Sequence, residues 1–118
     1  MNLTTTPQTI ASVPFTAPSA GTAFAMATGY CNLNPAPSKV YAQIETTANT
    51  LNSAPLTTLF ITENTTTSGT QFPFVISRAF AVSAGAQTLY LNAELVGSTS
   101  TSTACQTNMT VFFTSTSL

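Results

Sequence analysis

Few residues in this chain of 118 residues could do chemistry. The sequence has no His and no Asp, so nucleophiles activated by histidine, as in Ser–His and Cys–His pairs, are excluded. The three carboxylates, Glu45, Glu63 and Glu94, fall on different predicted strands or strand ends. Cleavage of a glycoside needs two carboxylates about 5–9 Å apart, whereas scattered carboxylates are typical of solvated strand faces. We therefore predict that the protein is not an enzyme.

The small number of ionisable side chains also argues against bound metals, cofactors and nucleic acid. Two cysteines without histidine or aspartate do not make a zinc site, and no stretch has the pattern of a calcium loop. Lys39 and Arg78 are the two cations of the chain. They cannot neutralise a useful number of phosphates, and we expect both to be surface charges. The sequence thus predicts no metal, no cofactor and no nucleic-acid partner.

The two cysteines are more informative. Cys31 ends one predicted strand and Cys105 begins the last one, where strand ends of a sandwich can lie side by side. An even number of cysteines in a small chain rich in Ser and Thr is typical of a disulfide in an oxidising compartment. The bridge would close a loop of about 75 residues, worth roughly 4.5 kcal/mol in the chain-entropy account. Two separate buried thiols are the alternative. We predict the bridge, and with it an extracellular or surface-exposed location.

The composition favours a folded domain with an unusually uncharged surface. Hydrophobic residues make up 43% of the chain, but charged residues only 4%, against about 25% in an average domain. The surface must consist mainly of hydroxyl and amide groups, and a net charge of −1 provides little repulsion between copies. We therefore expect self-association. No apolar run approaches the roughly 18 residues of a membrane span.

The clearest structural pattern lies in Ser77–Val96. Within Leu89–Leu95, every second residue is apolar, and Tyr90, Asn92 and Glu94 occupy the positions between. This period of two predicts a half-buried strand with a polar outer face. Gly85 precedes it, where a turn needs a residue that tolerates positive φ. The turn makes either a hairpin or a corner between two sheets.

Similar short runs are separated by turns rich in Pro, Gly, Ser and Thr. They are Ile10–Phe15, Thr22–Cys31, Lys39–Thr46, Leu56–Glu63, Phe72–Phe80 and Ala104–Thr114, and Pro14 confines the first run to an edge or a strand end. We predict an all-β fold, an antiparallel β-sandwich of jelly-roll type with about eight strands. It forms a single domain over residues 10–118, preceded by an extended arm over residues 1–9. We expect this polar arm to pair with the edge of a neighbouring subunit.

The second half of the chain also has a recognisable order of elements. Ser77–Val82 leads to the small-residue turn Ser83–Gly85, the alternating strand Gln87–Ala93 follows, and the last strand ends in Met109–Phe113 with paired aromatics. This order resembles small jelly-roll domains of the tumour-necrosis-factor and complement globular-head type, and similar domains of secreted bacterial surface and phage tail-fibre proteins. The resemblance implies a homotrimer or a building block of surface structures, without catalysis.

Two tyrosines are the candidates for recognition. Tyr41 and Tyr90 fall on the outward faces of their predicted strands, where rings serve in subunit contacts or stack on sugars. Our hypothesis is a non-enzymatic structural protein that self-assembles, as a trimer, another homo-oligomer or a filament, on a cell, spore or virus exterior. The alternative is a carbohydrate-binding or receptor-binding module, such as a phage fibre tip, with glycans as partners.

Overall fold

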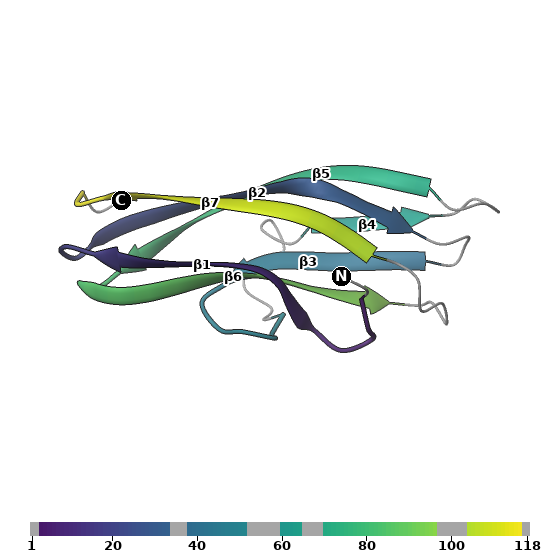
Figure 1. The fold of residues 1–118 in the computed structure, drawn as a ribbon, viewed down its shortest axis with the longest axis horizontal. Helices are drawn as coiled ribbons and strands as arrows, with labels where there is room; N and C mark the ends of the chain where they lie inside the picture. Colours follow the sequence, from purple (N-terminus) through teal and green to yellow (C-terminus); the bar gives the residue numbers. More distant parts are fainter. Residues whose placement is uncertain (1–2, 34–37, 52–59, 65–69, 97–103, 117–118) are drawn as a thin grey trace.

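The protein is a sandwich of two antiparallel sheets. The computed structural model describes residues 3–33, 38–51, 60–64, 70–96 and 104–116. Within these ranges the strands are β1 (Gln8–Ala17), β2 (Gly21–Leu33), β3 (Ser38–Glu45), β4 (Phe60–Asn64), β5 (Thr70–Val82), β6 (Gly85–Val96) and β7 (Ala104–Thr114). One sheet has the order β1-β6-β3-β4 and the other β5-β2-β7, and they lie face to face (Figure 1). No helix in the described ranges is long and apolar enough to cross a membrane.

This architecture confirms the predicted all-β, antiparallel class, with fewer strands than expected. Thr70–Val82 is one continuous strand, which contains both of the overlapping predicted runs Phe72–Phe80 and Ser77–Val82. The first residues of the predicted strand Leu56–Glu63 lie outside the described residues. A jelly roll has eight strands in two sheets, and the described residues form seven. The jelly-roll assignment therefore stays a prediction.

The molecule is elongated because its strands are long. β2 and β5 contain 13 residues each and pair along their whole length, from Gly21 opposite Val82 to Leu33 opposite Thr70. At about 3.3 Å per residue, such a strand spans roughly 43 Å. The extents of the molecule, 50 × 22 × 19 Å, follow from this length.

The core lies between the two sheets. The predicted inner side chains of β6 are all buried, which confirms the face assigned to this strand. The four-stranded sheet provides the larger core residues, Val40, Ile44, Leu89, Leu91 and Leu95. The central strand of the other sheet, β2, contributes small ones, Ala23, Ala25 and Ala27. Since inner and outer side chains alternate along a strand, the larger neighbours of these alanines point outward.

Gly85 marks a corner and not a hairpin. β5 and β6 belong to different sheets, although only Ser83 and Ala84 lie between them. Gly85 has a φ of 111°, a conformation that glycine adopts without the penalty of a Cβ. The expected positive φ is confirmed. The sequence left a hairpin and a corner between two sheets as alternatives, and the chain forms the corner.

The N-terminal segment belongs to the domain. Leu3 is buried in the hydrophobic core, and β1 already begins at Gln8. The backbone amide of Leu95 donates a 2.8 Å hydrogen bond to the carbonyl oxygen of Thr4. The predicted boundary after residue 9 therefore needs correction, because a single apolar anchor among polar residues holds this segment on its own subunit. The expected pairing of this arm with the edge of a neighbouring subunit stays a prediction.

Candidate functional site

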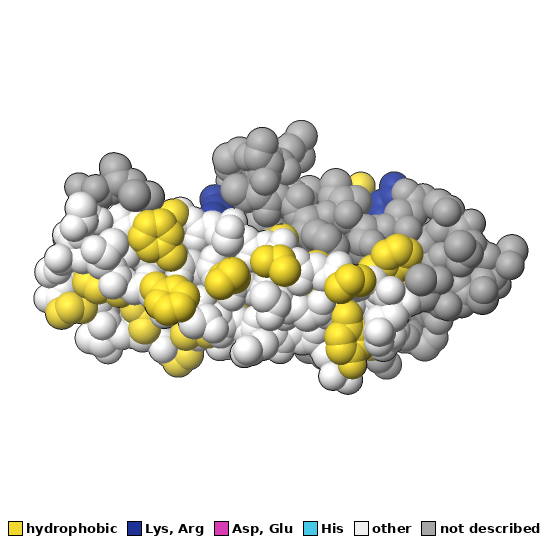
Figure 2. Space-filling view, turned by 90° about the horizontal axis from the view of Figure 1, so that it is seen from above, with side chains coloured by type: hydrophobic (Ala, Val, Ile, Leu, Met, Phe, Trp, Pro, Cys, Tyr) yellow, Lys and Arg dark blue, Asp and Glu magenta, His cyan; other side chains and the backbone are white. Residues whose placement is uncertain are grey.

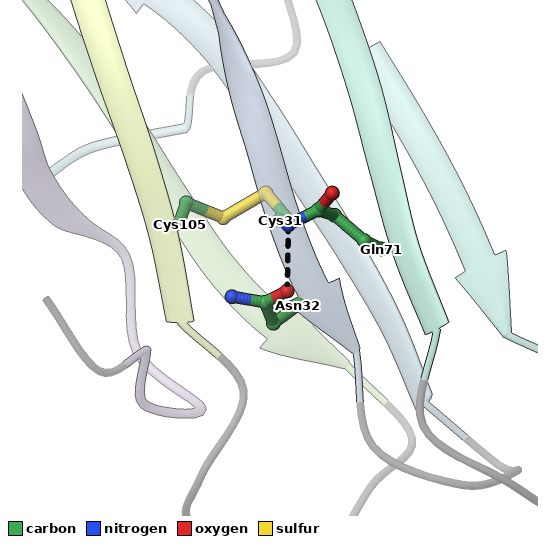
Figure 3. The surroundings of a disulfide bond; sticks show 4 residues. All are labelled: Cys31, Asn32, Gln71 and Cys105. Carbon is green, nitrogen blue, oxygen red and sulfur yellow. Dashed lines mark hydrogen bonds between the residues drawn. A yellow bond between two sulfur atoms is a disulfide. The ribbon is translucent and has the colours of Figure 1, made fainter.

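Cys31 and Cys105 form the predicted disulfide. The two residues face each other in the pairing of β2 with β7, their sulfur atoms are 1.99 Å apart, and both residues are buried. Figure 3 shows the bridge between adjacent strands and, beside it, Gln71 Nε2 of β5 donating to Asn32 Oδ1 of β2 at 3.3 Å. A buried disulfide suggests an oxidising, extracellular-type environment. It also ties β7 covalently to the centre of its sheet.

Charged residues are distributed unequally between the two sheets. The sheet β1-β6-β3-β4 contains Lys39, Glu45, Glu63 and Glu94 in its strands. The other sheet contains only Arg78, and this side chain reaches across to the first sheet. Its Nη1 donates a 2.9 Å hydrogen bond to the carbonyl oxygen of Ile44 and lies 3.9 Å from Glu45 Oε1. The side chains of Arg78 and Glu45 are 18% and 6% exposed, so the expectation that Arg78 is a surface charge is wrong. Lys39 is partly exposed.

The outer face of the sheet β5-β2-β7 consequently carries no charged side chain among the described residues. It exposes four large apolar side chains, Phe24 at 40%, Met26 at 43%, Val75 at 67% and Phe112 at 58%. Phe24 of β2 faces Phe112 of β7 in the strand register. Figure 2 looks onto this side of the molecule and shows hydrophobic side chains among uncharged ones, with cationic side chains only towards one margin. Such a face suits contact with another uncharged surface.

This face is also hollowed. An open depression is lined by Phe24, Met26, Ser77, Arg78, Ala79 and Phe112. Arg78 is the one titratable residue among them, and its side chain is directed inward to Ile44 and Glu45. The depression can therefore accept apolar atoms of a partner.

The two predicted recognition tyrosines lie on the opposite side of the molecule. Tyr41 of β3 faces Glu94, and Tyr90 of β6 faces Glu45, in the pairing of β3 with β6. Both tyrosines are partly buried. The buried pair Gln43 and Asn92 separates them in the register. The structure does not join the two rings into one exposed patch, and their role in contacts stays a prediction.

A polar segment covers part of that second face. Asn92 Nδ2 donates to the carbonyl oxygens of Thr47 and Thr50, both at 2.8 Å, and Asn92 Oδ1 accepts a hydrogen bond from Thr9 Oγ1, also at 2.8 Å. Asn49 bonds Thr9 in turn, through its side-chain oxygen and its backbone amide. The sequence assigned Asn92 to the correct face. This side chain is nevertheless buried, because the segment Thr47–Thr50 is hydrogen-bonded to it and covers it.

A second, polar depression lies next to Tyr90. Its lining includes Thr46, Ser83, Gln87, Thr88 and Tyr90, at the corner between β5 and β6. Hydroxyl and amide groups beside one aromatic ring are the groups that bind sugars. Gln87 Nε2 already donates to the carbonyl oxygen of Ser83 at 2.9 Å, so part of this polar surface is occupied internally.

No protein family, no curated protein and no solved structure matches the chain. Within the part of the chain that the structure describes, no group of three or more Cys, Asp or Glu residues could hold a metal ion.

The sequence contained a signal for the apolar face that its interpretation did not use. The alternation in Thr22–Cys31 separated Phe24 and Met26 from the alanines, and Phe112 had the opposite parity to Met109 and Val111. Aromatic residues usually mark the buried side of a strand. Here the small side is buried, and the direction became clear only from the packing of β2 against the opposite sheet.

Proposed function

We propose that this chain is a non-enzymatic structural protein that assembles with copies of itself on a cell, spore or virus exterior. The observation that carries the proposal is the outer face of the sheet β5-β2-β7, which exposes Phe24, Met26, Val75 and Phe112 without a charged side chain. A monomer gains nothing from leaving such a surface in water, since buried apolar area contributes about 25 cal/mol per Å².

Electrostatics would not oppose this assembly. The net charge is −1, and the charges are concentrated on the other sheet or directed towards it. Two copies that meet through this uncharged sheet therefore bring no like charges together. Association of this kind should depend little on salt, because screening acts only on charges.

The exterior location is supported by the buried disulfide, which suits an oxidising compartment. The finer fold assignment, a jelly roll similar to the tumour-necrosis-factor and complement type, is part of the same proposal. Domains of that type are building blocks of surface structures, which agrees with a self-assembling role.

Size-exclusion chromatography with light scattering over a concentration series tests the proposal. We expect the wild-type protein to form oligomers in the micromolar range, Phe112→Ser to weaken them, and Tyr90→Ser on the other sheet to leave them unchanged. A wild-type protein that stays monomeric at high micromolar concentration would contradict the proposal. If Tyr90→Ser weakens association and Phe112→Ser does not, the contact lies on the tyrosine side.

A carbohydrate-binding or receptor-binding module, such as a fibre tip, is the second candidate. The polar depression beside Tyr90 favours it. Titration of the wild-type protein and of Tyr90→Ala with a glycan panel separates the two functions. Saturable binding that Tyr90→Ala abolishes supports the module, whereas no binding at millimolar glycan leaves self-assembly as the function.

A further inference from the structure

The two sheets of the sandwich have four edge strands, β1 and β4 in one sheet and β5 and β7 in the other. An edge strand presents unpaired N–H and C=O groups, which can pair with another chain. Proteins that must avoid this pairing protect their edges by short strands, prolines, bulges or charges that point inward. The edges of this protein differ in whether they carry such protection.

Two of the four edges, β1 and β5, carry such protection. β1 contains Pro14, which has no N–H, and its register with β6 shifts between Thr9 and Ala11, as at a bulge. β5 contains Pro73 and the inward-directed Arg78. Each of these features hinders the addition of a further strand.

β7 has none of these protections. Its 11 residues, ACQTNMTVFFT, contain no proline, no glycine and no charge. They pair with β2 from Thr22 opposite Thr114 to Asn32 opposite Ala104 without a register shift. Among the described residues, no backbone hydrogen bond joins the other side of β7 to the rest of the chain. β7 is thus a long, regular and uncharged edge.

No described segment pairs with this edge. β1 of the other sheet lies alongside β7, but its backbone pairs with β6 and not with β7. The chain after β7 turns towards β2, where Thr22 Oγ1 donates to the carbonyl oxygen of Thr116 at 2.9 Å. The Cys31–Cys105 bridge fixes β7 to β2, so little order has to be gained when a partner strand adds.

We propose that β7 is the strand through which two copies of this chain associate, by antiparallel pairing of β7 with β7 about a two-fold axis. The inference rests on the proposed self-assembly and places its contact at the edge of the sheet β5-β2-β7, not on the outer face of that sheet. Pairing would join the two three-stranded sheets into one sheet of six strands. A two-fold contact places the same surface on both sides, which an uncharged strand tolerates without repulsion between like charges.

The exposed ring of Phe112 supports this choice of partner. Phe112 lies on β7 itself and is 58% exposed. In the paired state, the outer faces of the two copies become continuous, and the Phe112 rings of both copies lie along the joined edge. Backbone hydrogen bonds would provide the geometry of the contact, and these rings would bury apolar area at its surface.

Two variants distinguish an edge contact from a face contact. One places a positive charge on β7, and the other places the same charge on the central strand β2. Thr110 on β7 and Thr28 on β2 are both exposed on the outer face. We expect Thr110→Lys to weaken association by about tenfold or more, because each copy brings one cation to the contact. Thr28→Lys should change association by less than about twofold, since its cation lies one strand away from the contact.

Circular dichroism confirms that each variant is folded, and Asn108→Lys, on the same exposed side of β7, replaces Thr110→Lys if that variant does not fold. Hydrogen exchange provides a second measurement, with protection of backbone amides of β7 that rises with protein concentration. Two results would overturn the edge contact while leaving self-assembly in place. In the first, Thr28→Lys weakens association as much as Thr110→Lys does. In the second, the wild type assembles and neither variant weakens its association. A monomeric wild type overturns both.

Discussion

The guanidinium group of Arg78 in β5 donates a 2.9 Å hydrogen bond to the carbonyl oxygen of Ile44 in β3, and so links the two sheets. The same guanidinium lies 4.7 Å from the centroid of the Phe80 ring and 3.9 Å from Glu45. One of the five charged residues of the chain thereby serves the fold. Its removal from the surface is part of the reason why the outer face of its sheet is uncharged.

Arg78→Ala should lower the free energy of unfolding by about 1.5–3 kcal/mol, the range for a hydrogen bond to a charged group. The loss leaves the Ile44 carbonyl oxygen and Glu45 without this cation. Urea denaturation measures the change, and Ser77→Ala, at the exposed neighbouring position, is the control. A loss of stability no larger than that of the control would show that Arg78 does not hold the sheets together.

Replacing Leu91 by alanine tests the core. Leu91 is fully buried in β6, so Leu91→Ala should cost about 2–5 kcal/mol. Val75→Ala is the matched control, because Val75 is 67% exposed and should change stability by less than about 0.5 kcal/mol. Equal effects of the two substitutions would mean that the faces of the strands are exchanged.

Reduction of the disulfide should destabilise the domain without changing its sheet order. The bridge spans a sequence separation of 74 residues, and its loss should cost about 2–5 kcal/mol. Denaturation with and without reductant measures this difference, and mass spectrometry of the unreduced protein should show two hydrogens missing. Free thiols in protein from its native source would remove the support for an oxidising compartment.

Asn92→Asp should release the segment Thr47–Thr50. A carboxylate cannot donate to the carbonyl oxygens that Asn92 Nδ2 now bonds, and each buried polar group left unsatisfied costs about 1–3 kcal/mol. Hydrogen exchange and limited proteolysis at Thr46–Leu51 should both increase. Asn108→Asp, which adds the same charge at an exposed position, should leave this segment protected. Protection that persists in Asn92→Asp would show that the segment is held by other contacts.

The sequence was sufficient for features that depend on local pattern. Alternation placed Leu89–Leu95 correctly, Gly85 was expected to adopt positive φ, and Pro14 confined the first strand to an edge, where β1 is found. These features follow from the period of a strand and from the backbone preferences of two residue types. The disulfide was predictable because the chain has only two cysteines.

Other features depend on long-range packing, which alternation does not encode. Asn92, Gln43 and Glu45 lie on the outer face of their sheet, yet all three are buried, and Thr47–Thr50 bonds to Asn92. The pattern of Thr22–Cys31 defined two faces, but the packing against the opposite sheet decided that the alanines point inward. The burial of Leu3 likewise depends on contacts far along the chain.

Sedimentation velocity of the wild-type protein over a concentration series, at about 0.15 M and about 1 M salt, tests self-association most directly. An uncharged contact predicts oligomers in the micromolar range whose population does not fall at the higher salt concentration. A protein that is monomeric throughout, or whose oligomers dissociate when salt is raised, would contradict assembly through the uncharged sheet.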